Sequence, residues 1–211
     1  MYILAVHGSP RKNGNSEILL DSFIKGLSQS KEDKNNLTEI KIEKIRLPEL
    51  NFSPCRECGG CEIKEECVLE DDFKNILTPK IFSSDLLVVS TPIFFYSHTA
   101  YVQAFFERFQ AFWARKYVWK LPHPLNKKPK GILFSLGATK GAKLFEGLIR
   151  SYRYVLDAIY GNYVGGLFFR SIEKKGDILN FPEYLERAQN LGKEIISLPE
   201  ETWSLNRDPC P

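Results

Sequence analysis

The chain has 211 residues and a formal net charge of +3, and 43% of its residues are hydrophobic. This length is enough for one full-sized core and predicts a single ordinary globular domain. So small a charge argues against a nucleic-acid partner, and we expect the lysine-rich stretches 31–34 and 127–130 to be solvated turns. No apolar run approaches the roughly 20 residues that span a bilayer, and no secretory leader is visible, so we expect a cytoplasmic protein with no membrane partner.

Strand-like and helix-like segments alternate along the chain, which is typical of a parallel sheet covered by helices. The predicted strands are residues 2–7, 37–47, 86–90, 131–135 and 163–170. The predicted helices are residues 16–27, 73–80, 99–113, 144–159 and 182–198, with 28–36 as a linker and 116–130 as a surface insertion. Residues 48–70 form an irregular cysteine-rich loop within a domain of residues 1–198, and residues 199–211 form a tail.

Five strands joined by crossover helices predict a doubly wound α/β sheet. Of the two common strand orders, the flavodoxin-like order 2-1-3-4-5 suits a five-stranded chain. Ligands of such sheets bind beyond the carboxyl ends of the strands, near the switch between strands 1 and 3. The loops 8–16, 91–98 and 135–141 are therefore the predicted binding loops.

The first of these loops, with the sequence GSPRKNGNS at 8–16, joins a buried strand to a helix. Helix N-termini attract phosphate because their first amides are free and the helix dipole is positive there. Ser9, Asn13, Asn15 and Ser16 offer neutral hydrogen bonds, and Arg11 offers a charged one. The loop lacks the spacing of triphosphate and dinucleotide loops, so we predict a monophosphate ligand. The alternative is a polar turn in which Ser16 only caps the helix.

The loop at 8–16 resembles the FMN-phosphate loop of the NADPH-dependent FMN reductase family, which is flavodoxin-like. The segment TPIFFYS at 91–97 is similar to the family's aromatic flavin segment, and FFERF at 105–109 to its Lys-x-Phe-x-Asp-Arg element. Gln103 and Ala104 replace the usual Leu-Lys of that element. The resemblance covers about residues 1–198 and implies an FMN-binding oxidoreductase.

The loop at 91–97 also suits a flavin ring on physical grounds. Thr91 and Pro92 end a strand, and Ile93, Phe94 and Phe95 offer the apolar and aromatic contacts that a flat ring needs. The alternative is that these aromatic residues belong to the core. The resemblance implies that further residues face the flavin, namely Ser97, Ser135, Gly137, Ala138 and Thr139.

Four of the five cysteines, Cys55, Cys58, Cys61 and Cys67, lie within thirteen positions. Three of them follow one another at equal x2 spacing, which is closer to iron–sulfur ligation than to the paired knuckles of a zinc site. We therefore favour a [4Fe–4S] cluster. A zinc site and an empty or thiol-redox site stay open, because flavodoxin-like relatives with a similar stretch do not all carry a cluster. Cys210, in the tail, is expected to be a free thiol.

This cysteine motif beside the flavin loops is similar to the iron–sulfur flavoproteins of archaea and anaerobic bacteria. The resemblance implies one FMN and one [4Fe–4S] cluster per subunit, in homodimers that pair into homotetramers. We expect electrons to pass between NAD(P)H or ferredoxin, FMN, the cluster and a protein or small-molecule acceptor, with NAD(P)H bound transiently and no catalytic side chain. The alternatives are a cluster-free NAD(P)H-dependent FMN or quinone reductase and a non-enzymatic electron carrier like flavodoxin.

Overall fold

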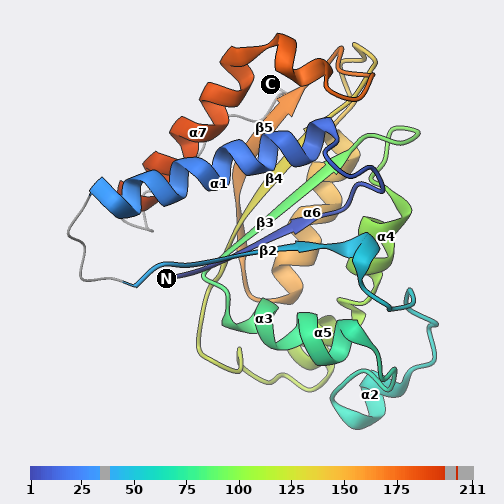
Figure 1. The fold of residues 1–211 in the computed structure, drawn as a ribbon. Coiled ribbons are helices and arrows are strands. Elements are labelled where there is room, and N and C mark those ends of the chain that lie inside the picture. The colour runs from blue at the N-terminus through green and yellow to red at the C-terminus, as the bar shows by residue number, and fades with distance from the viewer. Residues whose placement is uncertain (34–38, 198–202, 204–211) are drawn as a thin grey trace.

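The structure, a computed structural model, describes residues 1–33, 39–197 and 203, and contains the predicted five-stranded parallel sheet (Figure 1). The strand order is β2-β1-β3-β4-β5, as predicted. The strands are β1 (Tyr2–His7), β2 (Lys41–Arg46), β3 (Leu86–Pro92), β4 (Lys130–Leu136) and β5 (Asn162–Phe169). The α-helices are α1 (Asn15–Asp33), α2 (Gly60–Lys64), α3 (Thr78–Ser83), α4 (Ala100–Glu107), α5 (Gln110–Trp113), α6 (Glu146–Ala158) and α7 (Pro182–Ser197).

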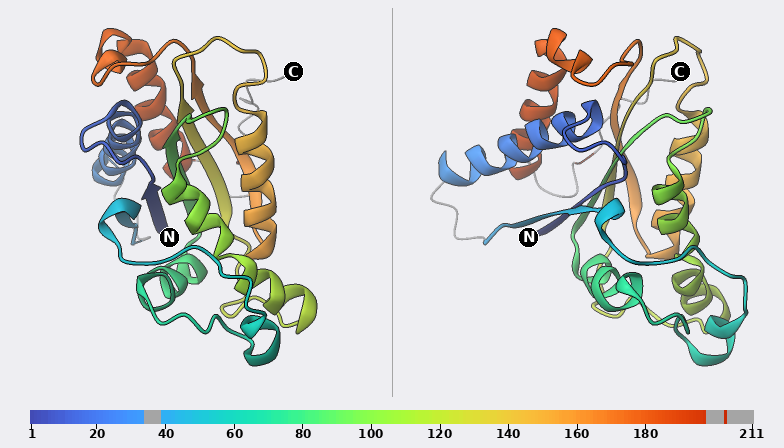
Figure 2. Two further views of the ribbon diagram at one scale, coloured as in Figure 1. Left: turned by 90° about the vertical axis from the view of Figure 1, so that its right-hand side faces the viewer. Right: turned by 45° about the vertical axis from the view of Figure 1, so that its right-hand side comes forward.

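The central strands are apolar because both faces of the sheet are covered by helices. Along β1, Ile3 and Ala5 face the core beneath α1 and α7, whereas Leu4 and Val6 face the core beneath α3, α4, α5 and α6. Figure 2 shows the two helical layers on opposite sides of the sheet. At its carboxyl end β1 places His7 beside Ser90 of β3. This pairing positions the loop that follows β1.

Helix α1 is longer than predicted, since residues 28–33 of the expected linker continue it. Its second half packs against α7, where the side-chain amides of Gln29 and Gln189 are 2.7 Å apart. The two helices approach so closely at Gly26 that a Cβ atom there would lie 1.9 Å from the carbonyl oxygen of Gln189. Tertiary packing thus extends a segment whose polar composition suggested a linker.

The predicted aromatic helix 99–113 is divided into α4 and α5. The hydroxyl of Thr99 accepts a hydrogen bond from Val102 N at 3.3 Å and caps α4, as such residues commonly do. A tight turn then intervenes, in which Phe109 N–H donates to Phe106 C=O at 3.0 Å. Residues Ala114–Val118 add one π-helical turn after α5, in place of the start of the expected insertion.

The cysteine-rich segment leaves β2 and runs away from the carboxyl end of the sheet. Figure 2 shows this segment and α2 beside α5, at the end of the molecule opposite to the loop that follows β3. Residues 199–202 and 204–211, and with them most of the predicted tail and Cys210, lie outside the described residues. Within the described part of the chain, no helix combines the length and the apolar character needed to cross a membrane.

Candidate functional site

A cavity of about 200 Å³ lies beyond the carboxyl ends of the strands. Three predicted loops contribute to it, together with a fourth, after β5, that the sequence analysis missed. The lining residues are Ser9, Arg11, Gly14, Asn15, Ser16, Pro92, Ile93, Phe94, Leu136, Gly137, Ala138, Ile172, Glu173 and Lys175. The carboxyl ends of parallel strands share one edge of the sheet, which explains why segments far apart in sequence meet here.

The loop after β1 forms the part of this cavity that suits a phosphate. Ser9 and Ser16 are buried, and Ser9 Oγ accepts a hydrogen bond from Arg11 N at 3.2 Å. The turn is tight at Gly14, where a Cβ atom would lie 3.2 Å from the carbonyl oxygen of Arg11. Glu17 N and Ile18 N donate to Gly14 O at 3.0 Å, so the amides of α1 that have no partner within the helix are those of Asn15 and Ser16. Free amides, two serine hydroxyls and one guanidinium fit a phosphate monoester.

Of the two asparagines expected to bind phosphate, Asn15 lines the cavity and Asn13 does not. Asn15 holds the loop after β5, because its Nδ2 donates to Lys174 O at 2.7 Å and its Oδ1 accepts from Gly176 N at 2.9 Å. Asn13 is exposed in the left-handed region, with φ +54°, and its N–H donates to Glu17 Oε2 at 2.7 Å. Asn15 is therefore a brace between two binding loops, and Asn13 does not line the cavity.

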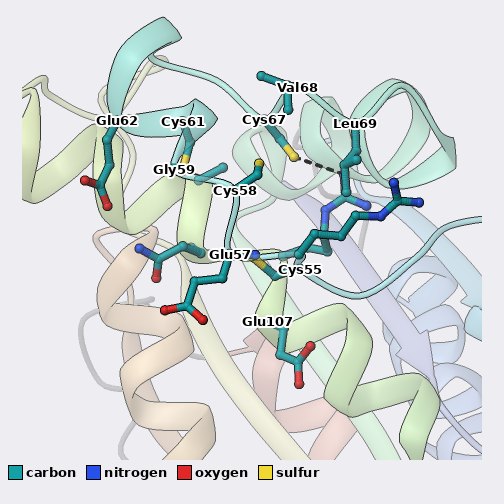
Figure 3. Close-up of a pocket in the computed structure, with 14 residues that line it drawn as sticks. Cys55, Glu57, Cys58, Gly59, Cys61, Glu62, Cys67, Val68, Leu69 and Glu107 are labelled. Carbon is teal, nitrogen blue, oxygen red and sulfur yellow. Dashed lines mark hydrogen bonds between the residues drawn. The ribbon is translucent and has the colours of Figure 1, made fainter.

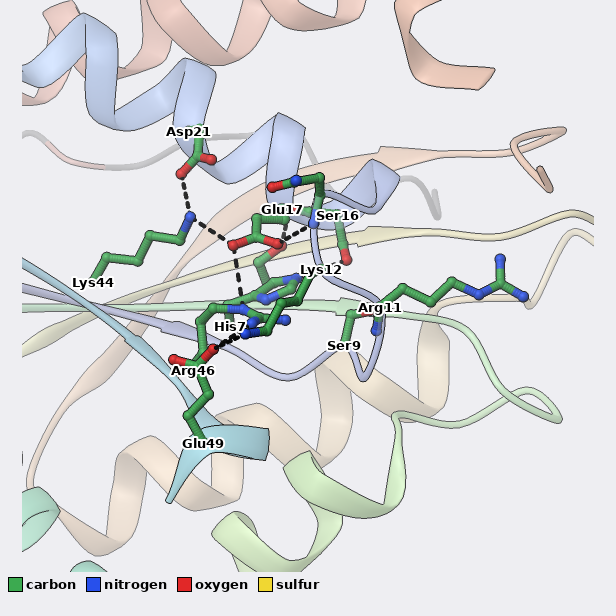
Figure 4. A network of polar contacts seen from close by, with 12 residues as sticks. His7, Ser9, Arg11, Lys12, Ser16, Glu17, Asp21, Lys44, Arg46 and Glu49 are labelled. Atoms are coloured by element: carbon green, nitrogen blue, oxygen red, sulfur yellow. Dashed lines mark hydrogen bonds and ion pairs between the residues drawn. The ribbon is translucent and has the colours of Figure 1, made fainter. Parts of the chain in front are cut away.

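A charged network lies behind the loop (Figure 4). The buried Glu17 carboxylate is 2.9 Å from Lys44 Nζ and 3.3 Å from Arg46 Nε, both of β2. Burial acts to raise the pKa of Glu17, but the hydrogen bonds from Lys44 and from Asn13 N outweigh it and leave the pKa below its ordinary value. An ionised Glu17 thus fixes the start of α1 to β2.

The loop after β3 lines the cavity only in part. Ile93 N donates to Leu136 O at 2.9 Å, which holds this loop beside the one after β4. Phe94 and Ser97 pair through two backbone hydrogen bonds of 2.9 Å, leaving Phe95 and Tyr96 as turn residues with φ of +50° and +61°. Phe95 is fully exposed and, unlike Phe94, does not line the cavity.

Of the remaining predicted flavin contacts, some are buried between strands β3 and β4 and others are exposed to solvent. Thr91 and Ser135 are buried, and Ser135 Oγ donates to Thr91 O at 2.8 Å, so they join β3 to β4 beside the cavity. Ser97 and Thr139 are exposed and are not among the residues that line it. Gly137 does line it, and a Cβ atom there would lie 3.1 Å from the side chain of Ile93. Contact of any of these residues with a flavin ring stays a prediction.

The four clustered cysteines line a second cavity of about 630 Å³ (Figure 3). Its wall is made by the segment after β2, by α2 and by the junction of α4 and α5. Gly59, with φ +68°, turns the chain into α2 between the second and third cysteines. All four cysteines, Cys55, Cys58, Cys61 and Cys67, therefore line the same cavity.

Hydrogen bonds and burial give the cysteine sulfurs different surroundings. Cys67 Sγ accepts a hydrogen bond from Arg108 Nη2 at 3.4 Å, and Cys55 Sγ accepts one from Glu57 N at 3.4 Å. Burial raises the pKa of the Cys61 thiol, and the nearby Cys67 and Cys55 add to the effect.

Arg108 was missed by the sequence analysis as part of this site. Its side chain is 1% exposed and is paired with Asp71, with 2.5 Å between Nη1 and Oδ2. Nη1 also donates to Ser53 O at 3.0 Å, and the guanidinium lies 4.7 Å from the centre of the Phe73 ring. Burial acts to raise the pKa of Asp71, but the hydrogen bonds from Arg108 leave it below its ordinary value. Arg108 thus holds both flanks of the cysteine segment.

The sequence profile described as NADPH-dependent FMN reductase matches residues 1–164 of the chain. The chain belongs to the NADPH-dependent FMN reductase family. The family is one of flavin-dependent oxidoreductases. The match includes the loop after β1, the loop after β3 and the cysteine segment.

Among the curated proteins, the chain is similar in sequence to several iron–sulfur flavoproteins. One, from Methanocaldococcus jannaschii, is 23% identical over 94% of this chain and 97% of its own length. Another, from Archaeoglobus fulgidus, is 31% identical over 108 residues, 51% of this chain and 45% of that protein. The match thus spans about half the length of the A. fulgidus protein.

A solved structure supports the flavodoxin-like fold of this reductase-family chain. It is the NAD(P)H:quinone oxidoreductase of Methanothermobacter marburgensis, with a TM-score of 0.66 and 18% identity over 94% of this chain and 98% of that one. At this identity the likeness concerns the fold alone.

The four thiols that line the cysteine cavity are ligands that a zinc ion or an iron–sulfur cluster would take. Among the described residues, no three His, Cys, Asp or Glu side chains lie close enough together to hold one ion. Four thiols around one cavity suit a [4Fe–4S] cluster, in which each thiolate binds a different corner of a larger body.

Proposed function

We propose that this chain is an FMN-dependent oxidoreductase that exchanges electrons with a partner through a [4Fe–4S] cluster. The observation that carries the proposal is the single cavity lined by Cys55, Cys58, Cys61 and Cys67 in a chain of an FMN reductase family. The iron–sulfur flavoproteins among its relatives support the same assignment. The chain's own residues would hold, orient and insulate the two groups.

FMN would lie in the cavity at the carboxyl end of the sheet. Ser9, Ser16, Arg11 and the first amides of α1 would bind the phosphate, while Ile93 and Phe94 would contact the ring. A flavin, once bound, accepts electrons in pairs or singly, which is the chemistry the fold does not supply itself. The loops after β3 and β4 would shield one side of the ring from water.

The cluster would be held by the four cysteines, and it supplies transfer of single electrons. Arg108 would keep Cys67 in place and donate to its sulfur. No side-chain nucleophile or general base is required of the protein. We expect NAD(P)H or ferredoxin as donor, a protein or small molecule as acceptor, and a homodimer or homotetramer as the assembly.

Cysteine replacement tests the cluster assignment. Serine variants of Cys55, Cys58 and Cys61, purified without oxygen, are expected to lose most of their iron and their broad visible absorption while keeping FMN. Cys210→Ser is the matched control and is expected to keep the iron of the wild-type protein. Full iron content in the variants of the clustered cysteines would refute the assignment.

A cluster-free NAD(P)H-dependent FMN or quinone reductase is the second candidate. The family match supports it, because residues 1–164 match the profile described as NADPH-dependent FMN reductase. Steady-state oxidation of NAD(P)H with quinone or ferricyanide distinguishes the candidates. Turnover that is unchanged in a Cys58→Ser variant would support a cluster-free reductase, and the absence of any turnover would point to a flavodoxin-like electron carrier.

A further inference from the structure

His7 is a buried histidine beneath the phosphate loop that the proposed chemistry does not use. It is the last residue of β1, it is 0% exposed, and its Nε2 lies 3.1 Å from the Oγ of Ser16. Ser16 in turn lines the cavity proposed for the phosphate. His7 therefore contacts the same Ser16 hydroxyl that a phosphate in the cavity would contact.

The other ring nitrogen decides which way this hydrogen bond runs. Within the described residues, Nδ1 of His7 is buried and has no hydrogen-bond partner. A proton on Nδ1 would bury a donor without an acceptor, which is the rarer and more costly arrangement. A proton on Nε2 instead lets the ring donate to Ser16 Oγ. Burial lowers the pKa of His7 to about 4, so the ring is neutral at neutral pH and carries only this one N–H.

The direction of the bond determines what Ser16 can do. A hydroxyl has one hydrogen to donate and can accept two hydrogen bonds. When Nε2–H donates to Ser16 Oγ, the hydroxyl hydrogen is left free for an anion. With the opposite tautomer, the Ser16 hydroxyl would donate its hydrogen to the imidazole and would present only lone pairs to the anion. The two tautomers therefore predict opposite contributions of Ser16 to anion binding.

We propose that His7 is a positioning residue that fixes the Ser16 hydroxyl as a donor to the phosphate of FMN. The inference rests on the proposed flavin function and adds a residue that acts through Ser16 rather than on the ligand itself.

The surroundings hold both members of the pair in place. Ser90 Oγ, on the strand beside His7, donates to the backbone carbonyl of Ser16 at 2.8 Å. The next residue along the helix, Glu17, is tied to Lys44 at 2.9 Å (Figure 4). These contacts fix the first turn of α1, and with it Ser16, to β2 and β3 beside His7.

Flavin titration of the full-length apoprotein, followed by flavin fluorescence, tests the inference with two ligands. FMN carries the phosphate and riboflavin lacks it. The amide nitrogen of His7→Gln reaches the position of Nε2, whereas that of the matched variant His7→Asn stops near Nδ1. We expect His7→Gln to keep wild-type FMN affinity, and His7→Asn and Ser16→Ala each to weaken it about ten-fold or more, the typical loss of one hydrogen bond to a charged group.

Riboflavin affinity should stay within about two-fold in all variants, and the double variant His7→Asn/Ser16→Ala should bind FMN no more weakly than Ser16→Ala. Wild-type FMN affinity in His7→Asn, equal losses for FMN and riboflavin, or additive losses in the double variant would overturn the inference. A wild-type protein that binds neither flavin would instead refute the flavin proposal, and this inference with it.

Discussion

Arg108 and Asp71 form a buried two-point ion pair, with Nη1 2.5 Å from Oδ2 and Nη2 3.1 Å from Oδ1. The same Nη2 lies 3.4 Å from Cys67 Sγ. The pair therefore ties the junction of α4 and α5 to the end of the cysteine segment. Such a pair is costly to break on one side only, because the remaining charge is left buried.

Replacement of Arg108 by Leu should lower the free energy of unfolding by about 3–5 kcal/mol, because Asp71 would lose its partner in a largely buried position. Urea unfolding of the wild type and the variant measures the change. Lys74→Gln is the control, since Lys74 pairs with Glu70, whose side chain is 66% exposed, and should cost about 1 kcal/mol or less. Equal effects of the two replacements would contradict the assigned role of Arg108.

Asn15→Ala should loosen the loop after β5. The variant removes the hydrogen bonds of the side chain to Lys174 O, Gly176 N and Ile178 N. We expect a loss of about 1–3 kcal/mol in stability and faster amide exchange across residues 174–178, measured by hydrogen–deuterium exchange. Asn180→Ala, an exposed position of the same segment, should leave exchange unchanged. Unaltered exchange in Asn15→Ala would mean that Asn15 does not hold this loop.

The lowered pKa of His7 predicts that the protein loses stability in acid. Burial lowers its pKa to about 4, with the positive charges of Arg46 and Lys44 acting in the same direction and Glu17 opposing them. The ordinary pKa is 6.5, so the unfolded chain takes up the proton first as the pH falls. Stability is therefore retained above pH 6.5 and is lost progressively between pH 6.5 and 4.

Between pH 7 and pH 4.5, the free energy of unfolding of the wild-type apoprotein should fall about 2–3 kcal/mol further than that of His7→Gln. Urea unfolding at the two pH values provides the comparison, and the other titrating groups are common to both proteins. Parallel losses in the two proteins would show that His7 does not titrate with a lowered pKa.

The binding edge of the sheet was predictable because parallel topology alone brings the ends of β1, β3 and β4 together. The cysteine cavity was predictable from the short spacing of the four thiols together with Gly59 and Gly60, which let the chain turn between them. The loop after β5 gave no such signal: Glu173 and Lys175 line the cavity from a loop that Asn15 holds at Lys174 O and Gly176 N. That contact crosses 159 positions of sequence and depends on the packing of α1 beside α7.

Two other differences have the same origin in tertiary structure. Phe95 was expected beside the cavity because it lies among aromatic residues, but the turn at Phe95 and Tyr96 leaves its side chain exposed and outside the cavity lining, so that its contact with a flavin stays a prediction. Arg108 looked like part of a family element, and only the fold shows that it lies between Asp71 and Cys67. Local composition indicates which residues are suited to a site, while packing decides which of them reach it.

The content of iron, acid-labile sulfide and FMN in protein purified without oxygen tests the central claim most directly. The account predicts about four irons and four sulfides for each FMN and each chain. FMN without iron would contradict the cluster and leave a cluster-free reductase. Protein that holds neither, even after reconstitution with both, would contradict the proposed function as a whole.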